Sequence, residues 1–141
     1  MIRLEVSAPD EALNANKRLH HMRKAEIVRN WRLRTAILAR KVKPVGHAHV
    51  ICYLHFDDNR RRDAGNWYPT AKACLDGIVD AGVLEDDSDN YVVGPDMRRG
   101  DNSPGGFAIT ITLNPECECV DCDERFGGND VGTPGVKARL T

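Results

Sequence analysis

Long apolar runs are absent from this 141-residue sequence, and no stretch approaches the roughly 20 residues that a membrane-spanning helix requires. The first residues, Met1 to Val6, also lack the uninterrupted apolar core of a signal peptide, because they include Arg3 and Glu5. We therefore expect a cytoplasmic protein. The length suits one domain with one core.

Disulfides are not expected, because five cysteines are an odd number and the chain shows no export signal. Three of them lie close together as Cys117, Cys119 and Cys122. A structural zinc site needs four ligands, so zinc would require a fourth from a distant histidine or from a second copy of the chain. The favoured alternative is a reduced, polar and glycine-containing tail over residues 115–141.

Three histidines are expected on one face of a strand, because His47, His49 and His55 are spaced by even numbers of residues. The spacing permits metal binding, but carboxylates would then be expected nearby. We favour a face that packs against a helix or contacts DNA.

A large excess of charge is also lacking, since the formal net charge is -1, and this value alone predicts no nucleic-acid partner. The charges are unevenly distributed, with +8 over residues 1–62 and -9 over residues 63–141. A basic surface beside an acidic one suits a nuclease, which needs cations for phosphates and carboxylates for a metal ion. The alternative is that the second half of the chain is merely acidic.

Hydrophobic periodicity predicts an α/β (α+β) fold with a small mixed sheet of about four strands and two main helices on one face. The predicted strands cover residues 2–6, 47–56, 91–97 and 107–113, and the helices cover residues 21–42 and 70–80. This domain would span residues 1–114. The tail would follow it.

Particular side chains can be assigned within these elements. The first helix would bury Val28, Trp31, Leu38 and Val42, and the second would bury Ala71, Leu75, Ile78 and Val79. Thr110 and Thr112 would face outward on the last strand. Gly82 would end the second helix. Gly77 costs about 1 kcal/mol inside a helix relative to alanine, which predicts close contact with another backbone, for which a dimer partner is one candidate.

The densest charged stretch runs from Arg60 to Asn66 and contains Arg60, Arg61, Arg62 and Asp63. Arginines can contact phosphates, and an aspartate beside them can hold Mg²⁺. Asp86 and Asp87 follow the second helix and would join Asp63 if that helix folds back. Lys72 would then stabilise charge that develops during phosphodiester hydrolysis.

A purely structural interpretation of the same residues is also open. Runs of arginine are usually solvated loops, and two adjacent aspartates often form only a turn. Lys72 and Asp76 are four residues apart on a helix and would form an ion pair worth about 0.2–0.5 kcal/mol. Trp67 and Tyr68 would more readily pack against the sheet than stack on a DNA base.

The arrangement resembles the RusA family of Holliday junction resolvases. The matching segments are Leu-Asn-Ala-Asn-Lys-Arg-Leu-His at 13–20, Arg-Arg-Asp-Ala-Gly-Asn at 61–66, Lys-Ala-Cys-Leu-Asp-Gly at 72–77 and Asp-Ala-Gly-Val-Leu-Glu-Asp-Asp-Ser at 80–88. The resemblance covers residues 1 to about 113 and is strongest over residues 60–88.

The resemblance implies a homodimeric, Mg²⁺-dependent endonuclease that cuts four-way DNA junctions in recombination and repair, with Mn²⁺ as an alternative ion. By this match Asp63, Lys72 and Asp87 are catalytic, and Asp63, Asp86 and Asp87 bind the metal. We expect DNA contacts from a further set of residues: Lys17, Arg18, Arg60, Arg61, Arg62 and Asn66.

One position departs from the family pattern, because Gly65 stands where the family has a second aspartate. Asp86, Asp76, the Asn66 amide or water would then supply the missing metal ligand. Two other functions remain open: a branched-DNA-binding module that has lost cleavage, and a nuclease specific for flaps or forks.

Overall fold

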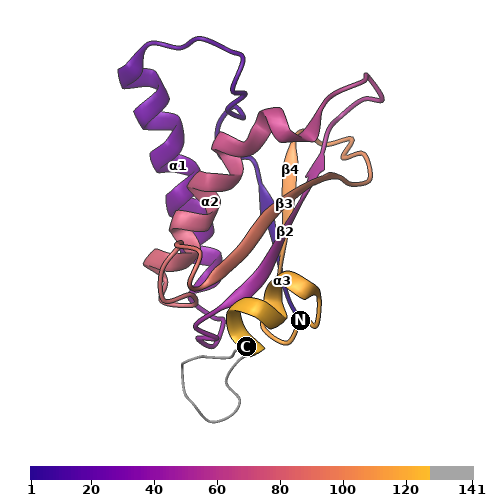
Figure 1. Ribbon diagram of the computed structural model, residues 1–141. Helices are drawn as coiled ribbons and strands as arrows, with labels where there is room; N and C mark the ends of the chain where they lie inside the picture. Colours follow the sequence, from indigo (N-terminus) through magenta and orange to yellow (C-terminus); the bar gives the residue numbers. More distant parts are fainter. Residues whose placement is uncertain (128–141) are drawn as a thin grey trace.

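The computed structural model describes residues 1–127, and residues 128–141 of the predicted tail lie outside the described residues. The elements are β1 (Ile2–Ser7), α1 (His21–Ala39), β2 (Ala48–His55), η1 (Ala64–Trp67), α2 (Tyr68–Asp80), β3 (Val92–Arg99), β4 (Ala108–Asn114), α3 (Val120–Cys122) and η2 (Asp123–Gly127) (Figure 1). The predicted order of four strands and two main helices is confirmed. Within residues 1–127, no helix is both long and apolar enough to cross a membrane.

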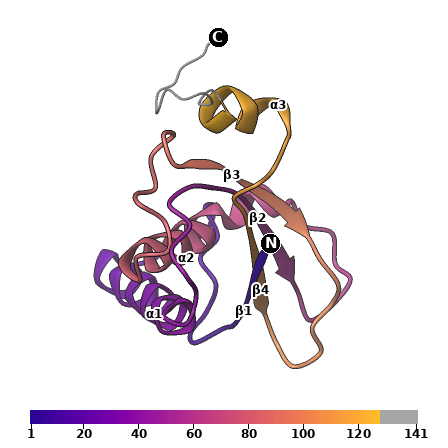
Figure 2. The same cartoon turned by 90° about the horizontal axis from the view of Figure 1, so that it is seen from below.

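The four strands form one mixed sheet in the order β1-β4-β2-β3. β4 runs antiparallel to both β1 and β2, whereas β2 and β3 are parallel. Parallel neighbours need a crossover connection, and α2 provides it between β2 and β3. Both long helices lie on the same side of the sheet, as predicted (Figure 2).

The alternation of buried and partly exposed side chains along β2 accounts for the core beneath these helices. The residues that face the helices are buried, whereas those between them remain partly exposed. The buried set is Ala48, Val50, Cys52 and Leu54, followed by Phe56 after the strand end. This pattern confirms the predicted inner face, because neighbouring side chains of a strand point to opposite sides of a sheet.

The predicted buried stripe of α1 is partly wrong. Trp31 is buried as expected, but Leu38 is exposed, and the buried positions follow a strict spacing of four: Ile27, Trp31, Thr35 and Ala39. The physical reason is the close approach of α2. A Cβ atom added to Gly77 would collide with the backbone of α1 at Arg32 and Ala36. Thr35, a small residue of this row, lies beside Gly77 and permits the approach, and the backbone partner of Gly77 belongs to the same chain.

Thr110 and Thr112 lie on the predicted outer face of β4, opposite Tyr53 and Ile51 of β2, but both are buried there. β4 lies between β1 and β2, so residues of two flanking strands cover each threonine. Thr110 also pairs with His55, whose Nε2 lies 2.7 Å from the threonine Oγ1. Thus the Thr110 hydroxyl is removed from water without losing its hydrogen-bond partner.

Candidate functional site

Asp63 begins the segment that links the end of β2 to α2. Its Oδ1 accepts a hydrogen bond from the Gly65 amide at 3.1 Å, which caps the single turn of η1. The Trp67 ring packs edge-on against Phe56 with 5.0 Å between centroids, as the packing interpretation predicted. Tyr68 is 44% exposed at the start of α2. The aspartate therefore sits on an anchored turn with its side chain at the surface.

The N-terminal loop is hydrogen-bonded to this turn. The amide of Leu13 donates to Thr70 Oγ1 at 2.7 Å, and the Thr70 hydroxyl donates back to the Leu13 carbonyl at 2.8 Å. The Ala15 amide donates to the Asn66 carbonyl at 2.7 Å. Consequently, the basic loop with exposed Lys17 and Arg18 is tethered beside the segment that carries Asp63.

Lys72 lies between two carboxylates. Its Nζ donates to Asp76 Oδ1 at 2.6 Å and also contacts Asp87 Oδ2. Burial lowers the pKa of Lys72, but the hydrogen bonds to Asp76 and Asp87 outweigh burial and raise that pKa above its usual value. The hydrogen bond from Lys72 lowers the pKa of Asp87. At neutral pH this is therefore an ion-paired cluster with a protonated lysine.

The three predicted metal ligands, Asp63, Asp86 and Asp87, are less closely gathered than Lys72 and its two carboxylate partners. Asp86 Oδ1 accepts from the Asp87 amide at 2.8 Å, so these neighbours share one turn. Within residues 1–127, however, Asp63, Asp86 and Asp87 do not form a group of three whose oxygens are close enough to surround one ion. Lys72 and Asp87 are thus brought into contact, whereas Asp63 stays outside that pair.

The three consecutive arginines have different environments. Arg60 is 76% exposed at its side chain, and Arg61 is also exposed. The Arg62 side chain is only 13% exposed, donates to Asp58 Oδ1 at 2.7 Å and covers the Phe56 ring at 4.4 Å. Arg62 therefore anchors the loop between β2 and η1, while the two arginines before it face solvent.

Arg99, which sequence reasoning missed, holds the same loop from the end of β3. Its two terminal nitrogens donate to the carbonyls of Arg60 at 2.7 Å and Asp58 at 2.8 Å. Its guanidinium also lies over the Phe56 ring, 5.0 Å from the centroid. The sequence contains no signal for this contact, because it depends on which strand borders β2.

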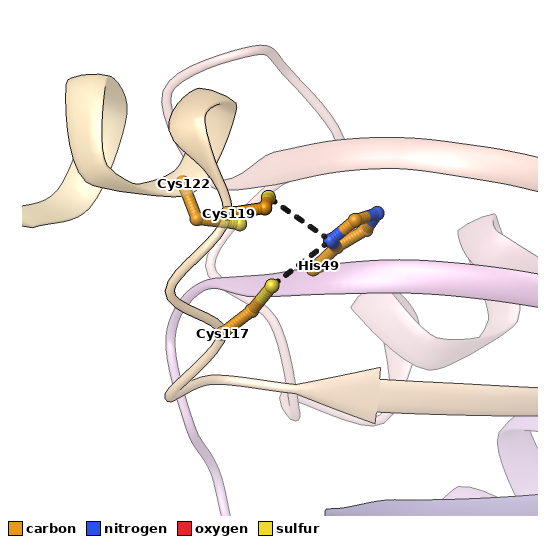
Figure 3. Close-up of side chains that lie close together, drawn as sticks. All are labelled: His49, Cys117, Cys119 and Cys122. Carbon is orange, nitrogen blue, oxygen red and sulfur yellow. Dashed lines mark hydrogen bonds between the residues drawn. The ribbon is translucent and has the colours of Figure 1, made fainter.

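A second cluster lies near the start of β2, where His49 meets the three cysteines after β4 (Figure 3). His49 Nδ1 lies 3.2 Å from Cys117 Sγ and 3.5 Å from Cys119 Sγ. Together with Cys122 Sγ, the four possible ligand atoms lie within 4.8 Å of one another. The Cys119 amide and the His49 ring lower the pKa of the Cys117 thiol to about 7.

The other two histidines of this face have separate partners. The His47 ring lies 4.2 Å from that of Phe126, and His55 Nδ1 lies 2.7 Å from the Asp101 carbonyl oxygen. The alternation of apolar and polar residues along β2 correctly placed His49 on the face away from α1 and α2, but nothing local in the sequence linked it to Cys117, 68 residues later.

Comparison of the sequence with protein-family models gave no match, and comparison with curated protein sequences gave no significant match. The fold and these two clusters therefore carry the functional argument.

Proposed function

We propose that this protein is a Mg²⁺-dependent, structure-selective endodeoxyribonuclease of the RusA type that resolves four-way DNA junctions as a homodimer. The supporting observation is that distant parts of the resembling motif are joined by hydrogen bonds. Leu13 pairs with Thr70, and Ala15 pairs with Asn66. Lys72 pairs with Asp87. Residues far apart in sequence thereby contribute to one region around the start of α2.

The three carboxylates suit Mg²⁺ by chemistry, because this ion prefers carboxylate oxygens and usually retains several waters. They are not gathered around one point in the structure, so Asp63 would have to approach Asp86 and Asp87 when the ion binds. Asp63, Asp86 and Asp87 would hold the ion, with water or DNA phosphate oxygens completing its ligands. When bound, Mg²⁺ would supply an activated water and offset charge on the phosphate. Asp87 favours its ionised form beside Lys72, as a ligand must.

Lys72 is protonated at neutral pH, so it would act as a hydrogen-bond donor and positive charge rather than as a general base. Its ammonium group is held by Asp76 on the same helix and by Asp87 in the turn before β3. Entry of a phosphate would offer it a third acceptor, on which negative charge grows during cleavage. Donors fixed before the reaction stabilise such charge without the cost of reorganisation.

Exposed cations of the N-terminal loop and of the loop before Asp63 would contact the DNA backbone. Lys17 and Arg18 lie on the tethered N-terminal loop, and Arg60 and Arg61 precede the aspartate. Asn66 would join them, although its carbonyl is engaged by Ala15. Such phosphate contacts position a protein on DNA without selecting a base sequence.

A homodimer follows from the substrate, because a four-way junction has approximate two-fold symmetry and resolution needs two symmetric cuts. Exposed apolar residues on α1 support this proposal, since Leu33 and Ile37 are 55% and 46% exposed and could contact a second copy. These residues are four apart, so they lie on the same face of the helix. Sedimentation of the wild type and of Leu33→Glu would test this surface.

The nuclease proposal is tested with labelled four-way junctions, flaps, forks and duplexes in Mg²⁺, Mn²⁺ or EDTA. Paired symmetric cuts in junctions, abolished by EDTA, are expected. Tight junction binding without cuts would instead identify a binding module that lost cleavage at Gly65. Cuts confined to flaps or forks would assign a different specificity, and no affinity for any branched DNA would reject all three functions.

A further inference from the structure

We propose that His49, Cys117, Cys119 and Cys122 form a structural zinc site, here called the zinc clasp, which is separate from the proposed nuclease chemistry. Three thiolates and one imidazole are a common ligand set of structural zinc. Soft sulfur donors favour Zn²⁺ and disfavour Mg²⁺, which prefers oxygen. The three cysteines provide only three ligands, and His49 of the same chain supplies the fourth.

The distances fit a tetrahedral ion. Zinc bonds of about 2.3 Å to sulfur and about 2.0 Å to nitrogen place ligand nitrogen and sulfur atoms about 3.5 Å apart, and two sulfurs about 3.8 Å apart. His49 Nδ1 lies 3.2 Å from Cys117 Sγ and 3.5 Å from Cys119 Sγ. All four ligand atoms lie within 4.8 Å of one another, so only small adjustments would be needed to surround an ion.

The far side of the imidazole is oriented by a carboxylate. His49 Nε2 lies 2.8 Å from Asp96 Oδ2, so this nitrogen carries the proton in the neutral tautomer and Nδ1 directs its lone pair at the thiols. Carboxylate–histidine–zinc arrangements of this kind recur in zinc proteins and keep the ligand ring in place. The cluster thus contains Asp96, which orients the histidine ring, in addition to the four ligands.

A β-bulge in β3 supplies Asp96 to this face. His49 pairs with Val93, but Ile51 pairs with Asp96, so β3 contains one extra residue between these pairs. Without it, Asp96 would point to the opposite face, because the side-chain period of a strand is two residues. Gly94 permits the bulge: its φ is +102°, and an added Cβ would collide with the Val50 carbonyl.

The segment after β4 has little apolar support for its folded position. Cys122 is the single buried residue among residues 115–127, and Val120 is 72% exposed. Arg125 adds a hydrogen bond of 2.9 Å to the Val92 carbonyl. A metal bonded to three cysteines would hold this polar segment against β2. All four positions come from the protein, which is typical of a structural rather than a catalytic zinc site.

The first test measures metal in the full chain, purified without a metal-affinity step and dialysed against metal-free buffer. We expect about one tightly bound zinc per chain, removable by a strong chelator under denaturing conditions. Refolding with Co²⁺ should produce the visible bands of a tetrahedral ion and sulfur-to-cobalt charge transfer. A zinc-free protein without these cobalt bands would overturn the proposal, as would a disulfide between the clustered cysteines in mass spectra.

Matched variants then assign the ligands. Cys119→Ser and His49→Ala should each lower zinc affinity at least tenfold, measured by competition with a chromogenic chelator. The controls are Cys74→Ser, a cysteine outside the cluster, and His55→Ala on the same strand face, and both should retain zinc. Unchanged affinity in both ligand variants would overturn the assignment. If a variant does not fold, the cobalt spectrum of the wild-type protein still tests whether the site binds metal. Failure of the nuclease proposal would leave the zinc result unaffected.

Discussion

Lys72 on α2 contacts Asp87, which lies 15 residues later in the turn before β3. The contact joins two residues that the RusA resemblance marks as catalytic. An ion pair of the same geometry could also serve stability alone, so kinetic measurements must separate these roles.

We predict that Asp63→Asn and Asp87→Asn abolish junction cleavage but preserve junction binding. The amide keeps the shape of the side chain and removes the charge that would hold Mg²⁺. Gel-based cleavage and binding assays, with Asp89→Asn at a highly exposed site as control, provide the check. Near-normal cutting by either variant would exclude that residue as a metal ligand.

Lys72→Ala should lower kcat by a factor on the order of 10² or more if the ammonium group stabilises charge in the transition state. The core stripe of α2 lies elsewhere, so the thermal midpoint should change little. Arg32→Ala, which removes another cation paired with an α2 carboxylate, Asp80, is the matched control. A change limited to KM would reassign Lys72 as a phosphate contact.

Arg61→Glu and Arg62→Glu should have different effects. Reversal at exposed Arg61 should weaken junction binding and flatten its salt dependence, by about 0.9 in slope for each duplex phosphate that the protein no longer neutralises. Reversal at Arg62 should lower the thermal midpoint, since it places a carboxylate beside Asp58 and removes the cation that covers Phe56. Thermal unfolding and binding at several salt concentrations distinguish these outcomes, and equal effects of the two reversals would contradict this picture of the loop.

Gly65→Asp should lower the Mg²⁺ concentration needed for half-maximal cleavage, because it adds a carboxylate beside Asp63. The site has room for it: an added Cβ would make only an ordinary 3.5 Å contact with Asp63 Oδ1. Gly65→Asn, which has the same shape without the charge, is the control. If both variants reached half-maximal cleavage at the same Mg²⁺ concentration, a charge effect at this position would be ruled out.

Gly77→Ala should lower the free energy of unfolding by roughly 1–3 kcal/mol, the usual cost of overpacking. The added methyl group would meet the α1 backbone at Arg32 and Ala36. Gly65→Ala is the control, because its surroundings are open. Denaturant unfolding of both variants tests the α1–α2 contact, and a stabilised Gly77→Ala would contradict it.

Local sequence patterns were sufficient to predict the helices, the strands and part of the candidate site. Alternation from Ala48 to Leu54 predicted which face of β2 is buried, and the four-residue spacing predicted that Lys72 could pair with Asp76. The close approach at Gly77 was likewise predicted from a glycine inside a helix. Each of these features depends on the repeat of a single strand or helix, which neighbouring residues are enough to reveal.

Strand order and side-chain contacts between elements required the tertiary structure. Thr110 and Thr112 are buried because β4 lies between two strands, and Arg62 is covered because its loop folds over Phe56. His49 meets Cys117 across 68 residues. The physical reason is that periodicity records which side of an element is apolar, whereas the partner on that side is decided by how the whole sheet is assembled.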